Sequence, residues 1–197
     1  MSWTTFHRRG DVLRDVYDEA DLRRDGTLPM QLPGVLGTSG TFRDELDLVG
    51  ALALRWSTRL HAAIERELSD DADGEPGDLE SAVRRAWIGT ARELPGIRAI
   101  LDRQLVSPDG PGVGEALQRA RDKEHATLAY AAGRGTGPEA VGVGDRIERA
   151  ARATYRPSIP MPSAPVPAPA PEVVSGPVQV PSGSAAFVAR IKAVLAA

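Results

Sequence analysis

The chain has 197 residues, of which 42% are hydrophobic, 5% aromatic and 26% charged, with a formal net charge of −3. This length suits one domain of ordinary size, and the charge balance gives no electrostatic reason to bind nucleic acid. Cysteine is absent and only three histidines are present, which excludes disulfides, thiolate catalysis and cysteine-based zinc sites. We therefore expect no cofactor and no nucleic-acid partner.

Targeting and membrane signals are missing from the sequence. The first residues lead directly into a charged stretch and lack the apolar core of a signal peptide. No run approaches the ~18 consecutive apolar residues that a membrane span needs. We therefore expect a cytoplasmic protein without a transmembrane segment.

Apolar residues recur every three or four positions along most of the first 155 residues, which is typical of amphipathic helices. The pattern predicts helices over residues 6–24, 42–68, 79–94, 97–105, 114–132 and 138–155. Alanine and arginine are abundant, and both favour helix. The fold class that follows is all-α, an irregular bundle of five or six helices in a domain of residues 1–155.

Several residues mark where these helices begin and end. Thr41 and Asp44 have the spacing of a capping box at the start of the long second helix. Asp78 is a suitable N-cap for the third helix. Pro95 lacks a backbone N–H and clashes with the preceding turn, so we expect a break at Leu94.

The composition changes abruptly after Tyr155. Nine of the 25 residues between Pro157 and Pro181 are proline, which is typical of an extended spacer without helix or sheet. We predict a disordered, flexible Pro/Ala-rich linker at 156–182 and a short amphipathic helix at 183–197.

The predicted C-terminal helix is the most informative feature of the sequence. An isolated helix this short is marginal in water, so we expect its apolar face to dock into a groove of a protein partner. Five apolar residues would carry the binding and two cations the orientation: Phe187, Val188, Arg190, Ile191, Lys192, Val194 and Leu195. Packing on its own domain, fraying, or lying on a membrane surface are the alternatives. The oligomeric state stays open.

A helical body followed by a Pro-rich spacer and a short terminal amphipathic helix resembles the layout of encapsulation peptides in bacterial shell cargo. The resemblance covers about the last 40 residues and is one of architecture, without a specific motif. It implies that the partner is a protein shell. From the predicted C-terminal helix we expect a non-catalytic adaptor or regulatory protein that docks on a protein partner, of which cargo of a protein shell is one form.

The alternative is a helical-bundle enzyme or metal-binding protein. His61 and Glu65 lie one helical turn apart, and Glu124 falls on an apolar stripe beside His125. Buried carboxylates often mark functional sites, but a Glu-x-x-His motif of the di-iron type is absent. We expect Glu124 to pair with an arginine, and we expect no metal ion to be bound by the other three residues.

The segment Ser69–Glu80 partly matches a calcium-binding loop. Its first position is Ser69 where the motif has Asp, and Pro76 stands where a free backbone N–H is needed. We therefore predict a surface loop without a metal ion.

Overall fold

A computed structural model describes residues 3–36, 40–72 and 78–155 of the chain. They form six helices, α1 (Trp3–Arg23), α2 (Glu45–Ala72), α3 (Leu79–Glu93), α4 (Pro95–Val106), α5 (Val113–Ala131) and α6 (Ala140–Thr154). Apart from an isolated bridge between Leu36 and Phe42, these ranges contain no β-structure. The all-α bundle that the sequence predicts is confirmed.

The chain divides into two units, Met1–Met161 and Pro162–Ala197, and the described residues all belong to the first unit. The predicted linker 156–182 and the predicted helix 183–197 lie outside the described residues. Within the described ranges, no helix has the length and apolarity needed to cross a bilayer.

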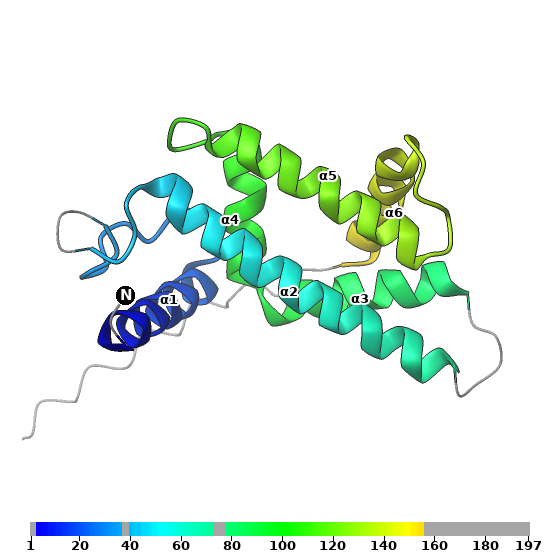
Figure 1. Ribbon diagram of the computed structural model, residues 1–197, viewed down its shortest axis with the longest axis horizontal. Coiled ribbons are helices and arrows are strands. Elements are labelled where there is room, and N and C mark those ends of the chain that lie inside the picture. The colour runs from blue at the N-terminus through cyan, green and yellow to red at the C-terminus, as the bar shows by residue number, and fades with distance from the viewer. Residues whose placement is uncertain (1–2, 37–39, 73–77, 156–197) are drawn as a thin grey trace, which may run out of the picture. The chain divides into compact units, whose positions relative to one another are not determined.

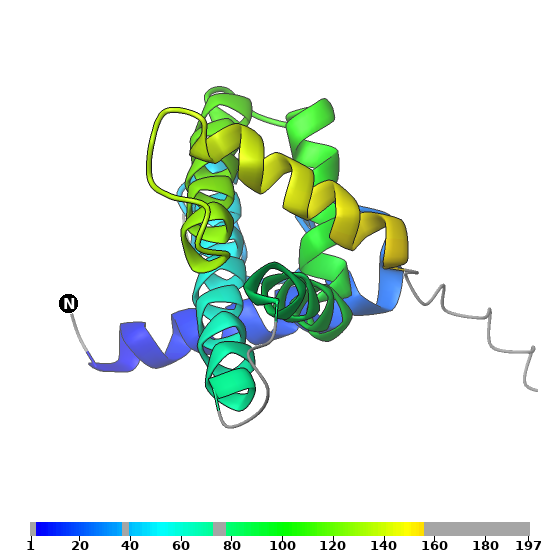
Figure 2. The ribbon, with the colours of Figure 1, turned by 90° about the vertical axis from the view of Figure 1, so that its right-hand side faces the viewer.

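Helix α2, 28 residues long, is the central element of the bundle and packs against α3, α4 and α5. Helices α2 and α5 run in the same direction, and α4 crosses behind them in the view of Figure 1. Helix α6 packs on α3 and α5, as the turned view in Figure 2 shows, while α1 packs on α4.

The core forms where the apolar stripes of these helices meet. The largest fully buried apolar side chains are Phe42, Leu48, Leu52, Trp56, Leu60, Trp87, Ile97, Ile100, Leu128 and Ile147. Trp56 and Trp87 meet edge to face, with ring centroids 5.8 Å apart. Such an arrangement directs the positive ring edge of one indole at the face of the other, and it fixes how α2 lies on α3.

Two of the predicted helix boundaries are confirmed. The side chain of Asp78 accepts a hydrogen bond from the backbone N–H of Glu80 and so caps α3. Helix α3 ends at Glu93 and α4 begins at Pro95, as the missing N–H of proline requires.

The predicted capping box at Thr41 is wrong. Asp44 caps α2 instead, because its carboxylate accepts from the backbone N–H of Asp47 at 2.8 Å. Thr41 donates its own N–H to the carbonyl of Gly34, and Phe42 is fully buried. These loop contacts hold the segment in a non-helical conformation, so the helix starts at Glu45.

Two glycines permit close helix crossings. A Cβ atom added to Gly96 in α4 would lie 2.2 Å from the carbonyl carbon of Ala20 in α1. A Cβ added to Gly144 in α6 would lie 2.0 Å from the carbonyl oxygen of His125 in α5. Both distances are far inside van der Waals contact, so the α1–α4 and α5–α6 crossings depend on the absence of a side chain.

We expect Gly144→Ala to lower the free energy of unfolding by about 3 kcal/mol, because the added methyl group forces α6 away from α5. Gly142→Ala is the matched control on the same helix, since a Cβ there meets nothing within 4 Å. Urea unfolding of both variants measures the difference. Equal stabilities of the two variants would contradict the described crossing.

Candidate functional site

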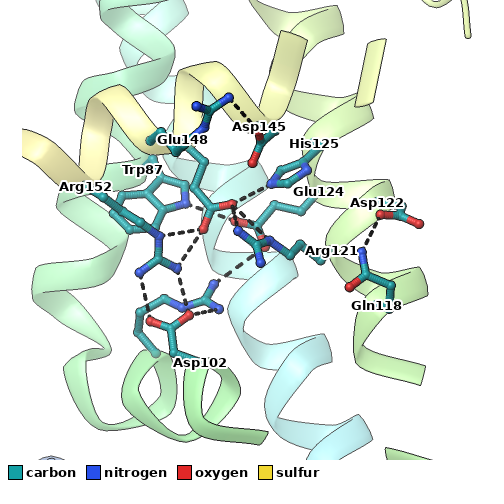
Figure 3. Close-up of polar contacts among 12 residues, drawn as sticks. Trp87, Asp102, Gln118, Arg121, Asp122, Glu124, His125, Asp145, Glu148 and Arg152 are labelled. Atoms are coloured by element: carbon teal, nitrogen blue, oxygen red, sulfur yellow. Dashed lines mark hydrogen bonds and ion pairs between the residues drawn. The ribbon is translucent and has the colours of Figure 1, made fainter. Parts of the chain in front are cut away.

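The centre of the domain holds a group of ionised side chains, shown in Figure 3, from α4, α5 and α6. Three guanidinium groups face three carboxylates: Arg98, Arg121 and Arg152 with Asp102, Glu124 and Glu148. We call these six residues the central charge cluster. Their formal charges cancel, which is the condition under which buried charges are tolerated.

Glu148 on α6 is the most enclosed member, with 1% of its side chain exposed. One carboxylate oxygen accepts from Nε2 of His125 at 2.5 Å and lies 3.3 Å from Nη2 of Arg121. The other oxygen accepts from Nε of Arg152 at 2.7 Å. Because a carboxylate can only accept, Nε2 of His125 carries a proton in this contact.

Arg152 links α6 to α4 through a two-pronged contact with Asp102. Its Nη1 and Nη2 atoms lie 2.8 and 2.7 Å from the two carboxylate oxygens. Asp102 also accepts from Nη2 of Arg98 at 2.7 Å. The guanidinium of Arg152 stacks 5.0 Å from the centroid of the Trp87 ring. Planar guanidinium groups suit such paired and stacked contacts better than lysine does.

Glu124 on α5 connects the cluster to the tryptophan pair. Its two carboxylate oxygens accept from the indole Nε1 atoms of Trp56 and Trp87, each at 3.0 Å. Nη1 of Arg98 lies 3.7 Å away and supplies the counter-charge. One carboxylate therefore satisfies the only hydrogen-bond donor of each buried indole and joins α2, α3 and α5.

The pKa of Glu148 lies well below its ordinary value of 4.5. Burial is the largest single influence and raises the pKa, but the hydrogen bond from His125 and the charges of Arg152 and Arg98 together outweigh it. The pKa of Arg152 is raised in turn: burial lowers it, while Asp102 and Glu148 raise it by more. Both groups are thus held in their charged forms.

The chemistry of the central charge cluster is that of a closed network. Each carboxylate already accepts from at least two donors, and Glu148 is held ionised with no exposed face. A general acid or base needs a pKa near the working pH and access to a substrate. The geometry therefore favours a structural role for these charges.

A second feature is a groove between α2, α4 and α5, with a volume of about 610 Å³. Its walls are mostly apolar and include Leu46, Ala53, Leu60, Leu101, Leu105 and Leu117. We call it the α2–α5 groove. Ligand sites in proteins share this combination of size and apolar lining with a few polar groups.

The structure brings only part of the predicted enzyme or metal alternative together. His61 is exposed on α2, and its Nδ1 donates to the backbone carbonyl of Ser57 at 2.7 Å, while Glu65 is also exposed. Glu124 and His125 are neighbours on α5 but direct their polar atoms to different partners. His61 and Glu124 do both line the α2–α5 groove. Within the described ranges, no three His, Asp or Glu side chains are placed to hold a metal ion.

The loop weighed as a calcium site begins later than the sequence suggests. Helix α2 continues to Ala72, so Ser69 and Asp71 are helical rather than part of a 12-residue loop. The rest of this loop, residues 73–77, lies outside the described residues. The same holds for the seven residues predicted to bind a partner: Phe187, Val188, Arg190, Ile191, Lys192, Val194 and Leu195.

Sequence reasoning missed most of the central charge cluster. The signal available was the position of Glu148 on α6, directly after Ile147 and four residues after Gly144, on the face that becomes buried. Arg152 follows one turn later, where it can reach the same carboxylate. Arg98 and Asp102 have the same one-turn spacing on α4 and were also missed, whereas the contact of Asp102 with Arg152 spans 50 residues and has no local signal.

No protein-family model, curated protein or solved structure matches this chain. Inference about its function therefore depends on its own residues and their arrangement.

We expect Glu148→Gln to lower the free energy of unfolding by about 2–3 kcal/mol, because it removes the buried negative charge that accepts from His125 and Arg152 and places an amide N–H₂ among donors. Asp145→Asn on the same helix is the control, since its partner Arg149 is 65% exposed. That control changes the unfolding free energy by no more than ~0.5 kcal/mol. Urea unfolding at pH 7 compares the two, and equal losses would contradict the structural role of Glu148.

The pH dependence of stability provides a second test. Because the pKa of Glu148 is lower in the folded than in the unfolded chain, its stabilising effect is present above its ordinary pKa of 4.5 and is lost as the pH falls further. The stability difference between wild type and Glu148→Gln therefore shrinks below pH ~5, by at most roughly 1.4 kcal/mol per pH unit. Urea unfolding at pH 7, 5, 4 and 3 measures it, and a constant difference would contradict this assignment.

Proposed function

We propose that the protein is a non-catalytic, cytoplasmic adaptor or regulatory protein. In this proposal the helical domain 1–155 is the body, 156–182 is a flexible spacer, and 183–197 is a helix that docks on a protein partner. Phe187, Val188, Ile191, Val194 and Leu195 bind the partner, and Arg190 and Lys192 set the orientation of the helix.

The observation that carries this proposal is that every carboxylate of the central charge cluster already has hydrogen-bond partners within the domain. In the central charge cluster the carboxylates accept hydrogen bonds from guanidinium groups of the same cluster, and Glu124 also accepts from two indoles. Such a network stabilises one arrangement of helices and supports a scaffold better than a catalyst. The enzyme or metal alternative receives less support, because Glu124 and His125 are both engaged in that network.

The sequence of the C-terminal segment supports docking. Its five large apolar residues fall on one helical face, while Ala189 and Ala193 fall on the opposite face. A spacer of 27 residues at about 3.1 Å each reaches on the order of 80 Å, so one docked helix could hold the body near its partner. In one form of this proposal the partner is a protein shell and the body is its cargo.

The test is purification of partners from the native cell with the full chain and with Phe187→Ser/Ile191→Ser. Each substitution removes an apolar side chain whose burial is worth about 1.5–3 kcal/mol, so we expect recovery of the partner to fall more than tenfold. Ala189→Ser/Ala193→Ser is the matched control, because it places two hydroxyls one turn apart on the opposite face. We expect this control to recover the partner as the wild type does.

Equal recovery of every partner by both double variants would overturn the docking proposal. If recovery is unchanged and Phe187→Ser/Ile191→Ser instead lowers the stability of the domain, the segment packs on its own body. Recovery of a closed, self-assembling shell would identify the protein as cargo, whereas recovery of a smaller complex would leave the adaptor role without the shell.

A further inference from the structure

The α2–α5 groove is left unused by the proposed docking of the C-terminal segment. It is lined by small residues on both long walls: Gly50, Ala53 and Ser57 on α2, and Ala116 and Ala120 on α5. From Leu46 to His61 the α2 wall covers 16 residues, and the 15 steps between them span roughly 22 Å at 1.5 Å per residue. The small side chains thus leave a long, narrow and mostly apolar space.

The two ends of this groove differ in polarity. Because α2 and α5 run in the same direction (Figure 1), residues early in both helices lie at one end and residues late in both lie at the other. The early end is apolar, with Leu46 and Ala116, and the late end carries Ser57, His61, Lys123 and Thr127 among its lining residues. The groove is therefore amphipathic along its length.

The polar end carries a cation that has no carboxylate partner among the described residues. Lys123 lines the groove and is exposed, and within the described part of the chain no carboxylate pairs with its ammonium group. Nε of Arg98, which stacks on Trp56 in the same region, is buried without an acceptor in these ranges. The carboxylate of Glu124 is already shared by two indoles and Arg98. This end would therefore attract an anion.

We propose that the α2–α5 groove binds an amphipathic carboxylate with an unbranched apolar chain, a ligand of the fatty-acid class. Its carboxylate lies at the polar end, paired with Lys123, and its chain extends between Ala53 and Ala120 toward Leu46. The chain's own predicted C-terminal helix has two cations and no acidic side chain in residues 183–197, so its side-chain charge has the wrong sign for a place beside Lys123.

The test is isothermal titration calorimetry of the full chain with dodecanoate, below its micelle concentration. We expect saturable binding of one ligand per chain. Dodecyltrimethylammonium, which has the same chain length and the opposite charge, should bind at least about tenfold more weakly, because like charges repel at the polar end.

Two pairs of variants locate the ligand. Gly50→Leu fills the groove, and it does not strain the fold because a Cβ there meets nothing within 4 Å. We expect it to weaken dodecanoate binding about tenfold or more, whereas Gly89→Leu, on the open side of α3, leaves binding unchanged. Lys123→Gln should weaken binding about fivefold, the scale of a solvent-exposed ion pair, and Arg119→Gln, elsewhere on α5, should not.

Absence of saturable binding, equal affinity for the two amphiphiles, or wild-type affinity in Gly50→Leu would each overturn this proposal. Phe187→Ser/Ile191→Ser is titrated as well. If dodecanoate binds only to that double variant, the C-terminal segment is the native occupant of the groove and the fatty-acid proposal is wrong. If wild type and double variant bind equally, the result supports the proposal and is independent of partner docking.

Discussion

The carboxylates of Glu124 and Glu148 are the two acceptors on which the packing of the bundle depends. Glu124 binds the indoles of α2 and α3, and Glu148 binds His125 of α5 and Arg152 of its own helix. Arg152 then reaches α4 through Asp102. A shift of any of these five helices would leave a buried charge or an indole N–H without its partner, at a cost of several kcal/mol.

This network explains why the core tolerates so many ionised groups. Replacing a buried ion pair by apolar residues is often neutral or stabilising, so the buried charges of Arg98 and Glu148 are not needed for stability alone. Apolar side chains can slide past one another at little cost, whereas a paired guanidinium and carboxylate match in one geometry. We infer that the central charge cluster selects one helix arrangement among several of similar apolar burial.

Local features of the fold were predictable from the sequence, and long-range ones were not. Proline chemistry at Pro95 and the side chain of Asp78 act within one turn, and both boundaries were predicted correctly. The capping box predicted at Thr41 was wrong because the backbone N–H groups of Thr41 and Phe42 donate to carbonyls of the loop several residues earlier. That competition between a cap and a tertiary contact cannot be read from residue spacing.

The same distinction holds for the candidate site. Helical spacing indicated that Glu124 points inward, and an arginine was expected beside it; Arg98 lies 3.7 Å away. Its principal partners, Trp56 and Trp87, are 68 and 37 residues distant in the chain. The sequence contains both indoles, but only the packing of α2 on α3 shows that one carboxylate can reach the two of them.

Arg98 and Glu124 belong both to the central charge cluster and to the lining of the α2–α5 groove. Anything that binds in the groove therefore contacts the network that holds the helices together. A ligand that binds only the folded chain raises the free energy of unfolding, and at concentrations above its dissociation constant the rise grows with the logarithm of the ligand concentration. A ligand in the groove would thus raise the free energy of unfolding of the whole bundle, which Arg98 and Glu124 help to hold together.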